Sequence, residues 1–181
     1  MKIIKVSTFI AIVCLFVLTP VITVFGWERT EASPSFHRVL VNGEHVQIAG
    51  YNISGVNYFR LRDIAYALNG SAAQFNLVWD ATMNGVRIYT ETPYVSIGGE
   101  LEYIASSSAV ATRSEANFSV DGNNVSFHFF GGFNPMPQSI PVVININGNN
   151  FFQLRYIGDL VGFHVGFVGA YNTVLINGII P

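Results

Sequence analysis

The sequence predicts an α+β fold: two repeats of a small curled antiparallel β-sheet, each packed around one short α-helix, after an N-terminal signal or anchor segment. Three observations predict it. The phrase "NYFRLRDIAYAL" at residues 57–68 returns as "NFFQLRYIGDLV" at residues 150–161. Asn-Gly and Asp-Gly turns between alternating apolar residues precede the two phrases, a pattern typical of β-hairpins. A long uncharged run follows the first five residues.

The N-terminal segment, residues 1–32, predicts export. The cationic start "MKIIK" precedes an apolar run at residues 6–25, and "TEA" at residues 30–32 offers small residues at a cleavage site, with "VFG" at 24–26 as a second candidate. Because the apolar run could also span a bilayer, a retained membrane anchor is the alternative to a cleaved signal peptide, which we favour. Both interpretations place the remaining chain outside the cytoplasm, secreted or at the cell surface.

The charge of the exported part excludes one class of partner. From Ser33 onward the chain has six Arg, nine Asp or Glu and no Lys, so its formal charge is 6 − 9 = −3. A protein that binds nucleic acid needs clustered cations, so we expect no nucleic-acid partner, and membrane contact only through residues 6–25. Cys14 lies in the leader and is the single cysteine, which excludes a disulfide-stapled scaffold.

An internal repeat organises the exported chain. Three blocks occur in the same order in both halves: "VLVNGEHV" and "FSVDGNNV", the helix phrases above, and "FNLVWDATMNGVRI" and "FHVGFVGAYNTVLI". We therefore predict a first repeat at residues 33–93, a linker with a possible strand at 94–116, and a second, diverged repeat at 117–181. The two units would pack together or exchange strands, and the oligomeric state stays open.

Each repeat is predicted to contain a hairpin, a third strand, a short helix and a second hairpin. Leu61, Ile64, Ala65 and Leu68 have the spacing of one helix face. Residues 75–79 alternate as in a half-buried strand, which predicts a core position for Trp79. A helix of two or three turns is not stable alone, so its apolar face must lie on a sheet.

These motifs resemble the copper amine oxidase N-terminal domain-like, or stalk-domain, repeat family of secreted and surface proteins of Gram-positive bacteria. The match is carried by "VNGEHV", "YNISGVNYFRLRDIAYAL" and "FNLVWDATMNGVRIYT", and it covers most of residues 38–178. The second copy departs at Tyr156, where the family has an acid, and at residues 167–168, where it has Trp-Asp. The resemblance implies a five-stranded antiparallel sheet around one helix, no catalytic copper, and a role in binding the envelope, spacing domains or mediating contacts.

Few residues of the sequence are candidates for a binding or catalytic site. Adjacent residues Arg62 and Asp63 do not face each other on a helix; Asp63 suits the helix N-terminus, and Arg62 is expected to reach a backbone carbonyl or a carboxylate. We keep Tyr58, Arg62, Asp63 and Arg155 as candidate binding residues. No catalytic residue is assigned. The four histidines lack metal-ligand spacing and are interpreted as surface residues without a metal or cofactor; they are His37, His45, His128 and His164.

Two functions fit these observations. The favoured one is a non-catalytic stalk or interaction module of the cell envelope that binds wall glycan or a surface protein. The alternative is an accessory module or a small envelope hydrolase that uses Asp63, Glu100 or Glu102, although the sequence offers no second group placed beside any of them. The insertion at residues 129–137 is a further candidate for wall contact.

Overall fold

The structure is a computed structural model that describes residues 29–103, 105–125 and 141–178. The predicted leader before Arg29, His128 and the insertion at 129–137 lie outside these residues. The first half contains β1 (Arg29–Ser35), β2 (Arg38–Val41), β3 (Glu44–Val46), β4 (Gly50–Ile53), β5 (Val56–Arg60), α1 (Leu61–Leu68), β6 (Phe75–Asp80) and β7 (Gly85–Thr90). The second half contains β8 (Ala109–Arg113), β9 (Asn117–Val120), β10 (Asn123–Val125), β11 (Val143–Ile146), β12 (Asn149–Gln153), α2 (Leu154–Val161), β13 (His164–Val168), the 3-10 turn η1 (Gly169–Tyr171) and β14 (Thr173–Asn177).

Strands of both halves form one closed barrel. Its order is β1-β4-β5-β12-β11-β8, and every neighbouring pair is antiparallel. The halves meet twice around the barrel: β5 pairs with β12, where Phe59 lies opposite Phe152, and β1 pairs with β8, where Ala32 lies opposite Ala109. Closure leaves no free edge in this sheet.

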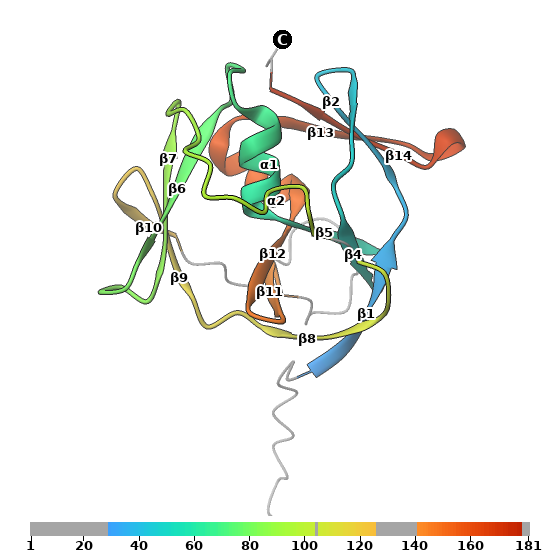
Figure 1. Cartoon of the computed structure of the whole chain (residues 1–181), viewed down its shortest axis with the longest axis horizontal. Coiled ribbons are helices and arrows are strands. Elements are labelled where there is room, and N and C mark those ends of the chain that lie inside the picture. Colours follow the sequence, from blue (N-terminus) through green and yellow to red (C-terminus); the bar gives the residue numbers. More distant parts are fainter. Residues whose placement is uncertain (1–28, 104, 126–140, 179–181) are drawn as a thin grey trace, which may run out of the picture.

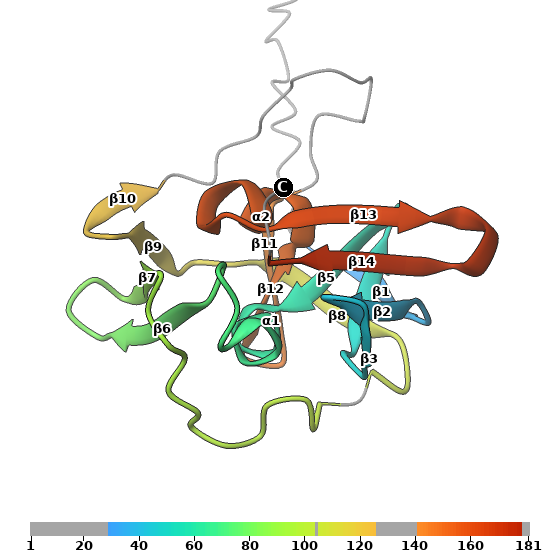
Figure 2. The same cartoon turned by 90° about the horizontal axis from the view of Figure 1, so that it is seen from above.

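Two four-stranded sheets flank the helices, and each again combines both halves. Their orders are β10-β9-β7-β6 and β13-β14-β2-β3. Strand β7 pairs in parallel with β9, and β14 pairs in parallel with β2. Figures 1 and 2 show the two sheets on opposite sides of α1 and α2. Strand β6 is an edge strand of the first of these sheets, and β13 is an edge strand of the second. Each lies beside the helix of its own half.

The predicted α+β fold, two repeats of a small curled antiparallel β-sheet that are each packed around one short helix, is wrong. The described chain is mostly β, with a closed six-stranded antiparallel barrel and two helices. The physical reason lies in the size of one half, because about 55 residues bury too little surface to be stable alone. Each half instead completes its sheets with strands of the other.

The local elements follow from the sequence patterns. Leu61, Ile64, Ala65 and Leu68 are all buried, as their helical spacing predicts. The Asn-Gly turn between β2 and β3 has positive φ at both Asn42 and Gly43, as a tight two-residue hairpin requires. The sequence prediction missed β1, β4 and β11. Because β4 pairs with β5 and β11 pairs with β12, the strand before each helix is half of a hairpin.

Two apolar cores result. The barrel interior holds one cluster: Ala32, Tyr51, Ile53, Tyr58, Ala111, Ile144, Ile146 and Phe151. The larger cluster fills the space between the barrel, the helices and the outer sheets, with Phe59, Phe152, Phe75 and Phe163 among its members. In the described part of the chain, no helix is both long and apolar enough to cross a bilayer.

Candidate functional site

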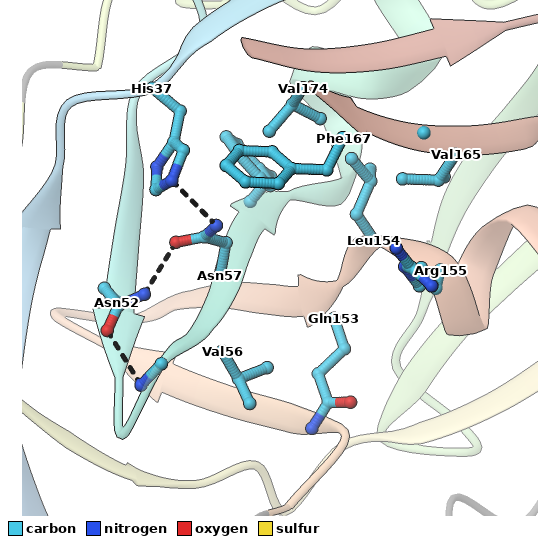
Figure 3. A pocket seen from close by; sticks show the side chains of 13 residues that line it. His37, Asn52, Val56, Asn57, Gln153, Leu154, Arg155, Val165, Phe167 and Val174 are labelled. Carbon is cyan, nitrogen blue, oxygen red and sulfur yellow. Dashed lines mark hydrogen bonds between the residues drawn. The ribbon is translucent and has the colours of Figure 1, made fainter. Parts of the chain in front are cut away.

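A pocket of about 500 Å³ opens where the two halves meet beside α2 (Figure 3). We call it the amide pocket. The β1–β2 turn and the β4–β5 hairpin line one side; the start of α2 and the β13–β14 hairpin line the other. Its polar side chains are His37, Asn52, Asn57, Gln153 and Arg155, and Phe167 supplies an aromatic ring. Amides, one cation and an aromatic face are the groups with which proteins orient a small polar ligand.

A hydrogen-bond network positions the amides of the first half. Asn57 Oδ1 accepts from Asn52 Nδ2 at 2.8 Å and from Ser35 Oγ at 3.3 Å, and its Nδ2 lies 3.4 Å from His37 Nε2. Ser35 Oγ lies 2.6 Å from His37 Nδ1. This pattern fits a neutral imidazole that donates from Nδ1 and accepts at Nε2. Burial lowers the pKa of His37, in agreement with a neutral ring.

The second half repeats most of this network. Asn150 Oδ1 accepts from Asn145 Nδ2 at 3.2 Å and from Ser114 Oγ at 2.9 Å. The amides and the serine therefore belong to the fold of both hairpins. Ala116 takes the position of His37, two residues after the serine. The serine has the same positioning role in both halves, because Ser114 holds Asn150 as Ser35 holds Asn57, and Ser114 does so without a histidine.

Phe167 is the exposed aromatic ring of the pocket lining, and two further exposed aromatic side chains lie on turns that adjoin pocket-lining residues in the chain. Phe167 is 50% exposed, and its ring centroid lies 5.5 Å from that of His37 in an edge-on arrangement. Phe36 and Tyr171 are strongly exposed on neighbouring turns, which a hydrogen bond from Asn172 to the Phe36 carbonyl joins. A flat ligand could stack on these rings.

Trp79 takes the place of Phe167 in the other half, and its predicted core position is wrong. It is 56% exposed. The alternation holds for Phe75, which is buried, and for Leu77, which packs against the main core cluster, but it does not hold for Trp79. Strand β6 is an edge strand, and Trp79 lies at its turn end, where neighbouring elements no longer cover the sheet.

Gln153 is held in the pocket by buried groups. Its Nε2 donates to Tyr58 Oη at 3.1 Å and to the Pro141 carbonyl at 3.2 Å, and Tyr58 Oη donates to the same carbonyl at 2.7 Å. Burial raises the pKa of Tyr58 to about 12, so this hydroxyl stays protonated and donates. Tyr58 itself is fully buried; it positions Gln153 and does not reach the pocket.

Asp63 belongs to a closed corner at the start of α1. Arg60 donates from Nε and Nη2 to its two carboxylate oxygens at 2.8 and 2.7 Å, and the N–H of Leu101 donates to Oδ1 at 3.1 Å. Arg60 and Arg62 both reach the Gly99 carbonyl, at 2.9 and 3.5 Å, a partner of the kind predicted for Arg62. Asp63 is completely buried, so its carboxylate serves the scaffold.

Glu100 organises the chain that covers this corner. Its carboxylate accepts from the Tyr94 and Ser96 hydroxyls, both at 2.8 Å, and from the N–H groups of Ile97 and Gly98 at 2.9 and 3.0 Å. Burial alone would raise the pKa of Glu100, but these hydrogen bonds lower it to about 2. Glu102 is exposed. The three acids of the hydrolase alternative are therefore not arranged as a pair flanking one cavity.

The structure does not gather the four candidate binding residues into one site. Tyr58 and Asp63 are buried, Arg62 lies under residues 94–101, and Arg155 is exposed at the amide pocket. Sequence reasoning missed His37, Asn57, Gln153 and Phe167. The asparagine that recurs in "VNYF" and "NNFF" was a signal for Asn57, while nothing local in the sequence marks His37.

Comparison with protein-family models, with curated proteins and with solved structures finds no match for this chain. The resemblance to the stalk-domain family therefore stays an expectation from its motifs. Among the described residues, no three of His, Cys, Asp and Glu lie close enough together to hold a metal ion.

Proposed function

We propose that the protein is a non-catalytic, extracytoplasmic interaction module of the cell envelope, and that the amide pocket binds wall glycan. The observation that carries the proposal is the half-exposed ring of Phe167 beside the hydrogen-bonded side chains of His37, Asn57 and Gln153 and the exposed Arg155. Sugar rings stack on aromatic faces, and their hydroxyls exchange hydrogen bonds with amides. The leader, and the resemblance to stalk domains, support the extracytoplasmic location.

Co-sedimentation of the full chain with isolated Gram-positive cell walls tests the proposal. Walls with and without their non-peptidoglycan polymers separate the two kinds of glycan. We expect saturable binding to at least one preparation. Phe167→Ala should weaken it about tenfold, which corresponds to about 1.4 kcal/mol, because it removes the stacking face. Trp79→Ala is the matched control, since it removes an equally exposed aromatic ring from the equivalent position outside the pocket.

Two results would contradict the proposal. The chain would stay in the supernatant with both wall preparations, or Phe167→Ala would sediment as well as the unchanged chain. Binding that Trp79→Ala weakens as much as Phe167→Ala would mean that exposed aromatics adsorb nonspecifically, and it would equally remove the pocket from the mechanism.

A further inference from the structure

Arg155 gives the amide pocket its charge. Among the described residues that line the cavity it alone is charged, and Figure 3 shows it on the α2 side, across from His37 and Asn52. The side chain is exposed, and neither of the ion pairs found in the described part of the chain includes it. Asp159, one turn further along α2, lines an adjoining depression and not the pocket. A positive charge without a nearby counter-charge favours an anionic ligand over a neutral or cationic one.

The equivalent arginine of the first half is used by the chain itself. Arg62 has the same place in α1 as Arg155 has in α2, and its Nη2 donates to the Gly99 carbonyl at 3.5 Å. No described residue accepts a hydrogen bond from Arg155. A guanidinium presents its N–H donors in a planar fork that matches a carboxylate through two parallel hydrogen bonds. The donors of Arg155 are therefore available to a carboxylate of the ligand.

Gln153 adds an acceptor beside this cation. Both hydrogens of its Nε2 are used, by Tyr58 Oη at 3.1 Å and by the Pro141 carbonyl at 3.2 Å. These two bonds fix the orientation of the amide and leave Oε1 without a donor among the described residues. A ligand hydroxyl or amide N–H can donate to this oxygen. Because Gln153 ends β12 and Arg155 is the second residue of α2, the acceptor and the cation lie on the same side of the cavity.

The pocket suits one carboxylate better than a dense polyanion. A polymer of phosphates is bound by several cations together, whereas the described lining of the pocket has one. The volume of about 500 Å³ lies in the range of small-ligand sites, about 300–1,000 Å³. Phe167 supplies a face for a sugar ring, and Val56 and Val165 supply apolar contacts for a methyl group such as that of an acetamido substituent.

We propose that the amide pocket selects an acidic sugar, whose carboxylate binds Arg155 and whose hydroxyl or acetamido N–H donates to Gln153 Oε1. This inference rests on the proposed function, because it names the part of the wall glycan that the pocket recognises. A sugar carboxylate in a wall has two sources, the lactyl ether of peptidoglycan and the uronic acids of other wall polymers. Both offer the same group to Arg155.

Titration of the full chain with three soluble disaccharides tests the proposal. N,N′-diacetylchitobiose is neutral, N-acetylglucosaminyl-N-acetylmuramic acid carries a lactyl carboxylate, and glucuronyl-N-acetylglucosamine carries a uronic carboxylate. Chemical shifts of the backbone amides give the Kd of each. We expect at least one acid to bind about tenfold more tightly than the neutral disaccharide, which corresponds to about 1.4 kcal/mol. The acid that binds more tightly identifies the source.

Arg155→Gln is the decisive variant, because it keeps a side-chain N–H donor and removes the charge. It should lower the affinity for the acidic disaccharide to that for the neutral one and leave the neutral affinity unchanged. The neutral affinity also shows that the variant is folded. Arg29→Ala is the matched control, since it removes an exposed arginine from the end of β1 that lies away from the pocket. It should retain the full preference for the acid.

Three results would overturn the proposal and leave wall binding in place. They are equal affinities for the acidic and neutral disaccharides, a preference for the acids that Arg155→Gln retains, and a chain that sediments with walls through Phe167 but binds none of the disaccharides. A chain that binds neither walls nor disaccharides would contradict the proposed function itself. The wall assay and the titration therefore separate the failure of the one from the failure of the other.

Discussion

The N-terminal ends of α1 and α2 occupy equivalent positions in the two halves, but the polar groups at these ends differ. At α1, Arg60 and Asp63 form a completely buried ion pair beneath residues 94–101. At α2, uncharged Gln153 and Tyr156 take the two positions, and the amide pocket opens beside Arg155. A buried ion pair is stable only when further hydrogen bonds satisfy both charges, and residues 94–101 supply them.

This difference separates scaffold from surface. Where the chain covers the corner, the polar groups are used internally and leave nothing for a ligand. At α2, where no described segment lies over the corner in this way, the charged pair is replaced by uncharged Gln153 and Tyr156, and Arg155 is exposed. A duplicated fold can in this way keep one half for stability and use the other for binding.

The largest expected loss of stability follows from removing the first part of β1, the strand that corresponds to β8 of the second half. A chain that begins at Ser33 loses four β1–β8 residue pairs and buried Ala32. We expect its free energy of unfolding to be about 4 kcal/mol lower than that of a chain that begins at Arg29, at about 1 kcal/mol for each lost hydrogen bond. Urea denaturation of both chains measures this difference.

Equal midpoints for the two chains would contradict barrel closure by β1. The result also bears on the predicted leader. Cleavage after residues 30–32 would remove part of β1, whereas cleavage after residues 24–26, which lie outside the described residues, would leave the strand whole.

The second effect concerns the buried ion pair. Asp63→Ala leaves the Arg60 guanidinium buried without its carboxylate, and we expect a loss of about 3–5 kcal/mol in the free energy of unfolding. The double variant Arg60→Gln, Asp63→Tyr copies the corner of α2. It should lose less than Asp63→Ala, since no charge stays buried, while the Leu101 N–H exchanges faster with solvent.

Denaturant titration gives the stabilities and amide hydrogen exchange gives the local opening. A double variant as unstable as Asp63→Ala would mean that the two corners differ in more than these two positions.

The helices and several strands could be predicted from local patterns, but β1, β4, β11 and the assembly of the sheets could not. Helix spacing and the Asn-Gly turns depend on residues a few positions apart, and both were confirmed. The barrel depends on pairs such as Tyr58 opposite Gln153, which lie far apart in sequence and leave no local signal. The amide pocket has the same origin, because its walls come from both halves. Trp79 shows a related limit. Alternation predicts which face of a strand a side chain is on, but it does not predict how much of that face neighbouring elements bury.

The third effect concerns Glu100 and acid. Its pKa is about 2 in the folded chain, against 4.5 ordinarily, so its contribution to stability is complete above pH 4.5 and is lost as pH falls toward 2. We expect the protection of the Ile97 and Gly98 N–H groups, measured relative to the intrinsic exchange rate at each pH, to decrease in that window. Glu100→Gln should exchange quickly at every pH, because it replaces an acceptor oxygen with a donor.

Hydrogen exchange resolved by residue is needed here, since Asp80 and Asp121 also have lowered pKa values and would affect global stability in the same range. Exchange at residues 97–98 that is insensitive to both pH and the substitution would remove Glu100 as the organiser of this segment.

The smallest effect tests one side-chain difference between the halves, since His37 at the amide pocket corresponds to Ala116 in the second half. Burial lowers the pKa of His37 below its ordinary 6.5. As pH falls below about 6.5, the unfolded chain therefore binds a proton that the folded chain resists, and stability decreases until the folded pKa is passed. Among the described residues that line the pocket, Arg155 alone is charged, and a cation cannot stabilise a second positive charge.

Urea midpoints at pH 7.5, 6.5 and 5.5 measure this slope. His37→Ala copies the Ala116 side and should reduce the slope with little change at pH 7.5, because the asparagine network persists around Ala116 without a histidine. His45→Ala, at an exposed position, should keep the full slope. If His37→Ala keeps it too, the proton is taken up elsewhere and the two halves do not differ in their response to pH. If the slope is lost and wall binding also weakens below pH 6.5 only in the unchanged chain, the neutral imidazole is part of the ligand site as well as of the fold.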